Sequence, residues 1–204
     1  MVSEEELLGA LKKTRLKGFG NPEIYKDSFL GLRRQMDTNL LVPPQRYVLK
    51  PTVNTILSLA DEFASRDVDI FDLYGAVLFW LEGSNPDTDN PIPLLPPIVE
   101  ESFEKEGRII WLINDGMHRV SAARARGRSI NVICITNVPR EYPYYAYGLP
   151  DGWAGVEEIS ELTDGYKKKD YRNPDNYKAL FRDFNGVFPG VQAERKKTQL
   201  YLKE

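Results

Sequence analysis

The stretch spanning residues 94–138 constrains the fold more than any other part of the chain. It contains three runs rich in β-branched and apolar residues, LLPPIVEES, RIIWLIND and INVICITNV, and a segment with helical character at 118–126 separates the last two. Short runs of this kind, bounded by turn residues, are typical of buried strands. Because a strand, a helix and a further strand commonly build a sheet layered by helices, we predict an α/β (α+β) fold with a mixed sheet and packed helices.

Additional helices are expected at both ends of the chain. Ser3 and Glu6 form a capping-box pattern ahead of an apolar stripe, which predicts a helix that Gly18 ends. Apolar residues at helical spacing predict two packed helices within residues 51–83, and Asn173 before Pro174 predicts the start of a last helix. Residues 20–50 are expected to be loop or extended structure.

Length and composition favour a single folded domain over residues 1–204. The hydrophobic share of 42% is ordinary for a folded protein. We divide the domain into an N-terminal helical part (1–83), a core (92–138) and an aromatic-rich C-terminal extension (139–204). Cys134, the single cysteine, excludes an intramolecular disulfide and alternates within a strand as a small buried hydrophobe would. No run is long enough to span a bilayer, and we expect a cytoplasmic protein that does not bind membranes.

Positive charge is concentrated after residue 115, although the whole chain carries a formal charge of −3. A modest local excess suits binding of a small anion such as phosphate, whereas nucleic-acid-binding domains are usually much more basic. Nucleic acid is therefore a disfavoured partner. The run of lysines at 167–169 is more typical of a solvated face than of a binding surface, although it could steer an anionic substrate.

The segment INDGMHRVSAARARG, residues 113–127, carries the chemistry and contains the only histidine. Gly116 allows a sharp turn from strand to helix and a close approach of backbone to a ligand. The first N–H groups of a helix have no internal partner and form a ready site for phosphate or carboxylate. His118 and Arg119 lie on that first turn, and Asp115 could orient His118, accept a proton or hold a hydrated Mg²⁺. The alternative is that His118 only caps or packs at the helix start.

This segment resembles a known family. DGMHRVSAARARG is similar to the Asp-Gly-x-His-Arg signature of the ParB/sulfiredoxin superfamily, and PPIV before it and INVICITNV after it match the strands that flank the helix in that family. The resemblance covers residues 92–138. It implies a ParB/sulfiredoxin-like fold whose loop and helix start hold nucleotide phosphates, with the binding residues Asp115, Gly116, Met117, His118 and Arg119.

Departures from the family pattern select among its branches. Sulfiredoxins have a catalytic cysteine before the His-Arg pair, where this chain has Met117, and a thioether is no thiolate nucleophile. The chromosome-partitioning proteins, which bind CTP, add a helix-turn-helix region after the nucleotide core, and only about 66 residues follow Val138 here. The free-serine kinases carry Asp-Gly-His-His-Arg, which differs from this segment only at Met117.

The kinase resemblance implies a nucleotide-dependent phosphoryl transfer to a small-molecule hydroxyl. It implies ATP or ADP as cofactor, Mg²⁺ held by Asp115, and catalytic roles for Asp115 and His118. A carboxylate base for the acceptor is also needed, and Glu100 and Glu101, at the end of a predicted strand, are the candidates. Two alternatives remain open: a non-catalytic nucleotide-sensing or scaffold module, and a DNA-interacting ParB-like protein.

The segment PYYAYGLPDGW, residues 143–153, is the second candidate region. Its tyrosines, which include Tyr144 and Tyr147, could form a wall that stacks on a nucleobase or sugar. The alternative is a structural aromatic loop that packs over the sheet.

Overall fold

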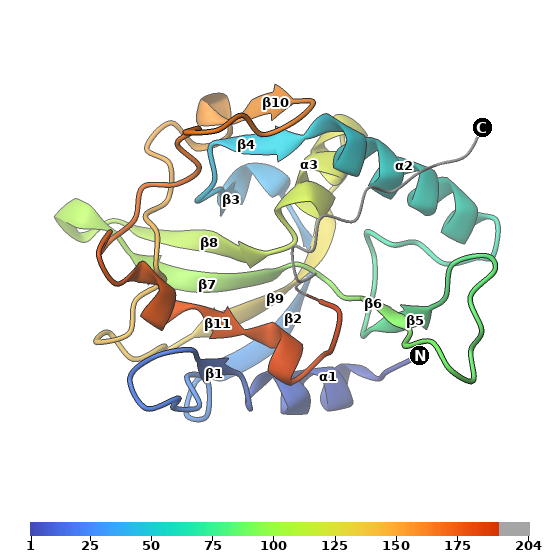
Figure 1. Cartoon of the computed structure of the whole chain (residues 1–204), viewed down its shortest axis with the longest axis horizontal. Coiled ribbons are helices and arrows are strands. Elements are labelled where there is room, and N and C mark those ends of the chain that lie inside the picture. Colours follow the sequence, from blue (N-terminus) through green and yellow to red (C-terminus); the bar gives the residue numbers. More distant parts are fainter. Residues whose placement is uncertain (192–204) are drawn as a thin grey trace.

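A five-stranded mixed sheet forms the centre of the computed structural model, which describes residues 1–191 (Figure 1). β9 and β7 are parallel, as are β8 and β3, whereas β2 with β9 and β7 with β8 are antiparallel. The predicted α+β class with a mixed sheet is therefore confirmed. In spatial order the strands are β2 (Phe29–Met36), β9 (Ile130–Thr136), β7 (Ile98–Phe103), β8 (Ile109–Asp115) and β3 (Leu41–Val42).

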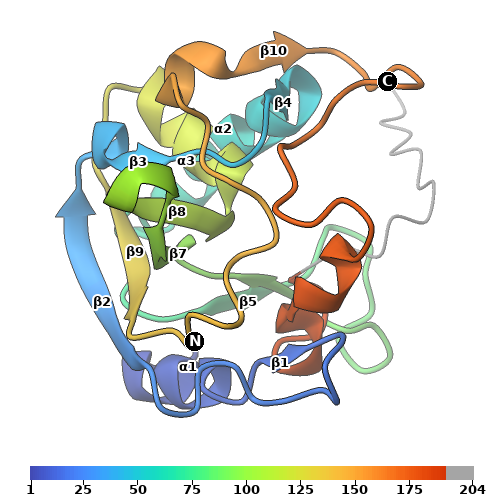
Figure 2. The same cartoon turned by 90° about the vertical axis from the view of Figure 1, so that its left-hand side faces the viewer.

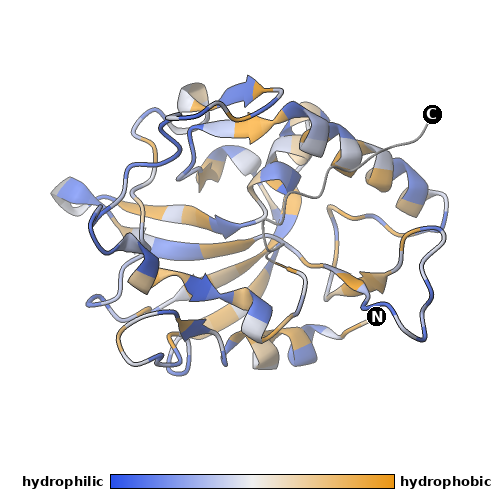
Figure 3. Ribbon diagram, in the orientation of Figure 1, coloured by the Kyte–Doolittle hydropathy of each residue, from blue (hydrophilic) through white to orange (hydrophobic). Residues whose placement is uncertain are grey.

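Helices cover both faces of this sheet. α2 (Lys50–Ala64) and α3 (Met117–Ala125) pack on one face, and α1 (Glu4–Leu11) packs on the other (Figure 1). Because side chains alternate along a strand, neighbouring residues enter different cores: Val99 lies under α2 and α3, and Ile98 lies over α1. Apolar residues accordingly run along the strands (Figure 3).

Three two-stranded ladders and five 3₁₀ turns complete the structure. β1 (Arg15–Leu16) pairs with β11 (Arg182–Asp183), β4 (Tyr47–Leu49) with β10 (Glu157–Ile159), and β5 (Val77–Phe79) with β6 (Ile92–Leu94). The 3₁₀ turns are η1 (Thr38–Leu40), η2 (Lys105–Gly107), η3 (Gly152–Gly155), η4 (Tyr177–Leu180) and η5 (Phe184–Gly186). The β1–β11 ladder brings segments near the two ends of the described chain side by side (Figure 2).

The capping box at the start of α1 is confirmed. The Ser3 N–H donates to the Glu6 carboxylate at 2.8 Å, and the Glu6 N–H donates to Ser3 Oγ at 3.3 Å. The predicted end at Gly18 is wrong, because the helix ends at Leu11 and the chain turns into β1. Cys134 packs partly buried against the core as predicted, and burial raises the pKa of its thiol to about 11.

The second of the two helices predicted within residues 51–83 is wrong. The first is α2, but residues 70–75 form turns, bends and irregular backbone, Ala76 forms an isolated bridge, and residues 77–79 form β5. Val2 and Ala76 exchange two backbone hydrogen bonds of 2.8 and 3.0 Å, and a Cβ on Gly75 would lie 2.1 Å from the Val2 carbonyl oxygen. Pairing with a distant segment therefore overrides the local helical pattern.

The predicted C-terminal helix is also wrong, because only the single turn η4 forms, with Asn176 at its N-cap instead of Asn173. The chain then extends into β11, where Arg182 reaches a buried partner on β7. None of the described helices is long and apolar enough to cross a membrane.

Candidate functional site

The turn between β8 and α3 requires glycine. Gly116 is the N-cap of α3 with a φ of +88°, a left-handed conformation that side chains disfavour. A Cβ at this position would lie 2.8 Å from Pro97 Cβ and 3.0 Å from an Arg119 guanidinium nitrogen. The absent side chain thus lets the strand end, the loop before β7 and the helix start meet closely.

The first turn of α3 offers backbone donors. The Val120 N–H makes the first helical bond, to the Gly116 carbonyl at 3.0 Å, so the preceding N–H groups of the helix have no acceptor within it. The positive end of the helix dipole lies at the same place. The Met117 side chain packs in the core, and only its backbone is suited to contact a ligand.

His118 is held as a neutral imidazole. The Leu49 N–H donates to its Nε2 at 3.0 Å, so this nitrogen is the acceptor and the ring hydrogen belongs on Nδ1. Burial, and secondly the charge of Arg119, lower the pKa of His118 to about 4. Near neutral pH the side chain therefore offers one N–H donor and no positive charge.

The lowered pKa of His118 predicts a loss of stability in mild acid. The unfolded state binds a proton near pH 6.5 and the folded state only near pH 4, so the free energy of unfolding should decrease as pH falls through this window. We expect a decrease on the order of 2 kcal/mol, measured by urea denaturation at several pH values. Because the chain has a single histidine, the His118→Gln variant removes this contribution completely. An equal pH dependence of the variant and the native protein would contradict the assignment.

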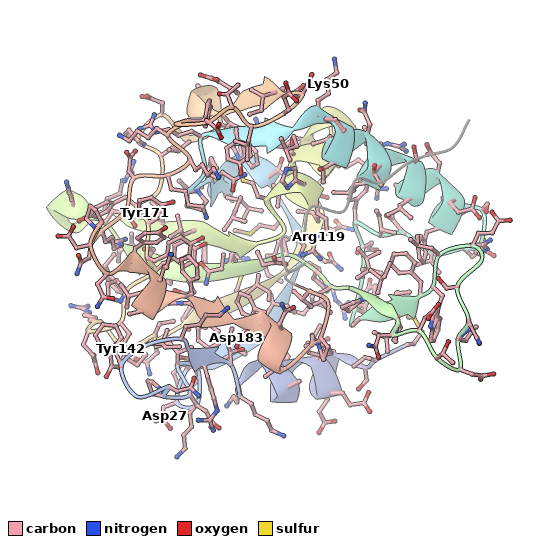
Figure 4. All side chains as sticks on the ribbon, in the orientation of Figure 1. Asp27, Lys50, Arg119, Tyr142, Tyr171 and Asp183 are labelled. Carbon is pink, nitrogen blue, oxygen red and sulfur yellow. The ribbon has the colours of Figure 1, made fainter. Side chains whose placement is uncertain are left out.

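Arg119 and Asp115 form an ion pair that fixes the loop. The Arg119 guanidinium donates to the Asp115 carboxylate and to the Leu95 carbonyl, and the two side chains are only 14% and 19% exposed. Arg119 lies near the centre of the molecule (Figure 4). The pair leaves Asp115 Oδ1 and further guanidinium N–H groups for a ligand.

Residues 115–119 line a cleft of about 460 Å³. Three further polar residues from distant segments, Gln45, Thr52 and Lys169, line the same cleft. Its apolar wall is formed by residues of α2 and of the β5–β6 hairpin, including Ile56, Leu59, Phe79, Ile92 and Leu94. The structure therefore brings together the binding residues that the sequence nominated.

The reasoning from sequence missed Lys169 and Gln45. An isolated bridge pairs these two residues across 124 positions of the chain, from 45 to 169. Lys169 belongs to the lysine run that we assigned to a solvated face, and Lys167 does fit that assignment, because it pairs with Asp170 at 2.6 Å. No local signal distinguishes the lysine that enters the cleft from its neighbour.

Glu100 and Glu101, the candidate bases, are not at the cleft. Glu100 is 2% exposed and accepts two hydrogen bonds from Arg182, at 2.9 and 3.0 Å, and others from Tyr25 and Asn114. Glu101 follows it on β7, where alternation points its side chain to the opposite face. Among residues 1–191, Asp115 is the carboxylate that lines the cleft.

The residues that line the cleft offer few ligands for a metal ion. The described part of the chain contains no group of three His, Cys, Asp or Glu residues placed to hold a metal. Mg²⁺ commonly binds through one or two carboxylates together with substrate phosphates and water. Asp115 fits this pattern as a single ligand, so any Mg²⁺ here would depend on bound phosphates.

A family model for the ParB CE domain matches residues 6–157. The chain belongs to the ParB CE domain family. No curated protein and no solved structure matches it significantly. Membership confirms the ParB-like resemblance drawn from the Asp-Gly-x-His-Arg signature and does not select the free-serine kinase branch.

The ParB CE domain match contains the whole five-stranded sheet and the β8–α3 turn. It begins within α1 and ends at the first residue of β10. Lys169 therefore lies beyond the matched residues, and this chain completes the cleft of its ParB CE domain with a residue from its own C-terminal segment.

Proposed function

We propose that this ParB CE domain binds a nucleotide through its phosphates at the start of α3. The observation that carries the proposal is the convergence of unlike donors on one cleft: backbone N–H groups of a helix start, His118 and Lys169. Helix starts with such donors bind phosphate readily, and a cleft of about 460 Å³ has the size of a small-ligand pocket.

Each cleft residue has a distinct role in this proposal. The Nδ1–H of His118 donates to a phosphate oxygen without adding charge, and the Lys169 ammonium supplies the charge. Arg119 holds Asp115 and Leu95 in place and directs its remaining N–H groups to the ligand. The apolar wall, with Ile56, suits a nucleobase. When bound, Mg²⁺ at Asp115 would neutralise phosphate charge.

The position of Glu100 favours a second candidate, a nucleotide-sensing module without catalysis. Phosphoryl transfer to a hydroxyl needs a carboxylate that positions the acceptor. The Glu100 carboxylate pairs with Arg182, and one oxygen of the Asp115 carboxylate pairs with Arg119. Small-molecule kinase activity with ATP or ADP thus rests on the resemblance in the signature and on Asp115 Oδ1 as the base in place of a Mg²⁺ ligand. The cytoplasm, which the sequence predicts as the location, would supply these nucleotides.

Calorimetry with ATP, ADP, CTP and GTP, each with and without Mg²⁺, tests nucleotide binding. We expect saturable binding by the native protein and at least about tenfold weaker binding by His118→Ala, a loss of about 1.4 kcal/mol. Arg126→Gln is the matched control, because Arg126 follows the same helix and contacts Asp61 on α2 instead of the cleft. Failure of the native protein to bind all four nucleotides would refute the proposal, as would equal affinities of native and His118→Ala proteins.

Product analysis separates the two candidates. Transfer of phosphate from a bound nucleotide to serine or another small alcohol, lost in Asp115→Asn, would establish the kinase. Nucleotide that binds tightly and stays intact with every acceptor would establish the sensing module.

A further inference from the structure

A second cavity, of about 470 Å³, adjoins the cleft at the start of α3 and shares Gln45, Asn114 and Lys169 with it. Its other walls come mainly from residues 144–145 and from residues 168–185. The lining residues from residue 158 onward lie beyond the ParB CE domain match. The cavity is therefore largely built by residues that follow the matched domain.

Five aromatic residues of this cavity form a packed cluster, which we call the aromatic wall. The ring centroids of Tyr171 and Tyr177 lie 4.0 Å apart in a stacked arrangement, and those of Tyr145 and Phe181 lie 4.5 Å apart. The ring centroids of Tyr144 and Tyr145 lie 4.2 Å apart. Rings that already pack on one another lose little conformational entropy when a flat ligand joins them. Tyr171 lies far from α2 in the view of Figure 4.

Lysines give the cavity a positive potential. Lys17, Lys168, Lys169 and Lys178 line it, and within residues 1–191 no Asp or Glu does. Lys169 is the best placed, since its ammonium donates to the Tyr145 hydroxyl at 2.5 Å and lies 4.6 Å from the centre of that ring. Lysines of this arrangement attract an anion, and a cationic ligand would be repelled.

A rigid base holds the aromatic wall in place. Arg182, 2% exposed, donates to the carbonyls of Tyr142 at 2.9 Å, Pro143 at 3.1 Å and Leu180 at 2.8 Å, and so ties the segments before Tyr144 and Phe181 together. Its charge is compensated by Glu100. Burial raises the pKa of Tyr144, so this phenol stays neutral. The lysines, and not Arg182, are thus the source of affinity for an anion.

We propose that this cavity binds a second small ligand, an anion that carries a planar ring, beside the nucleotide cleft. The ring packs against the aromatic wall, and the carboxylate or phosphate of the ligand contacts Lys169 and Lys178. The volume admits a small molecule and not a folded partner. Lys169 is shared with the cleft, but the aromatic wall and three further lysines, Lys17, Lys168 and Lys178, line only this cavity, so the proposal holds whether or not the cleft binds a nucleotide.

Binding of phenyl phosphate, measured by calorimetry without nucleotide, tests the proposal. We expect saturable binding, with methyl phosphate, which has the same anionic group and no ring, at least about tenfold weaker. Tyr177→Leu should weaken phenyl phosphate binding by about tenfold, and Lys178→Gln, an exposed change that alters no packing, by about threefold or more. Lys167→Gln is the control and should bind as the native protein does, because Lys167 pairs with Asp170 outside the cavity.

The outcomes separate the two cavities. Loss of phenyl phosphate binding in Tyr177→Leu and Lys178→Gln, with binding retained in His118→Ala, would support the second cavity even if nucleotides do not bind. The proposal would be overturned by the reverse pattern, by equal affinity for methyl phosphate, or by no saturable binding to the native protein. Displacement of phenyl phosphate by a short oligothymidylate of at least about hundredfold higher affinity would also overturn it, in favour of a single-stranded nucleic acid.

Discussion

Replacing Arg182 with methionine is expected to lower the free energy of unfolding by about 3–5 kcal/mol. Arg182 and Glu100 are each 2% exposed, and the guanidinium donates two hydrogen bonds of 2.9 and 3.0 Å to the carboxylate. Removing one partner leaves a buried, uncompensated carboxylate, which is far costlier than the loss of a surface ion pair. Three backbone carbonyls lose their donor as well. Urea denaturation followed by circular dichroism measures the change.

Two variants control for this effect. Glu100→Gln combined with Arg182→Met removes the buried charge and should regain part of the lost stability. Arg66→Met, which breaks an exposed pair with Glu62, should change the free energy of unfolding by less than about 1 kcal/mol. If Arg182→Met were no more destabilising than Arg66→Met, the buried pair would not hold the two segments together.

Gly116→Ala is expected to lower the free energy of unfolding by about 2–4 kcal/mol and to abolish nucleotide binding. The left-handed φ of +88° alone costs a residue with a Cβ about 1–3 kcal/mol. The added methyl group would also lie 2.8 Å from Pro97 Cβ, so the β8–α3 turn must move away from the loop before β7. That movement displaces His118 and the helix start together.

Gly127→Ala separates the two causes. Gly127 also has a positive φ, of +63°, but a Cβ there would have no neighbour within 4 Å in the described part of the chain. This variant should lose only the conformational part, about 1 kcal/mol, and should bind nucleotide normally. Equal losses in the two variants, measured by thermal and urea denaturation, would show that the close approach at Pro97 is unimportant.

Local patterns predicted the centre of the fold correctly because local forces dominate there. β7, β8, α3 and β9 follow one another in sequence, and their β-branched runs and turn residues agree with the sheet that they form. The wrong predictions of helices concern segments whose conformation depends on pairing with a distant part of the chain. Residues after 70 have a helical pattern, yet Ala76 pairs with Val2, and the residues after Tyr177 extend because β11 pairs with β1.

The residues of the candidate site were also only partly predictable from local sequence. Residues 115–119, which the signature nominated, line one cleft, because a strand end, a glycine turn and a helix start are contiguous. Glu100 could not be assigned from sequence, since its partner Arg182 lies 82 positions later. The second cavity depends on rings from residues 144–145 and 171–181, which only the folded chain brings together.

The β1–β11 ladder determines the order in which parts of this protein can fold during synthesis. Arg15 pairs with Asp183, so during synthesis β1 leaves the ribosome well before the strand with which it completes its hydrogen bonds. The five-stranded sheet can close once β9 has emerged, whereas the aromatic wall and Arg182 arrive later. In a nascent chain, the five-stranded sheet would thus form while the charge of Glu100 still lacks its partner Arg182. The second cavity would form only when the last described segment has been synthesised.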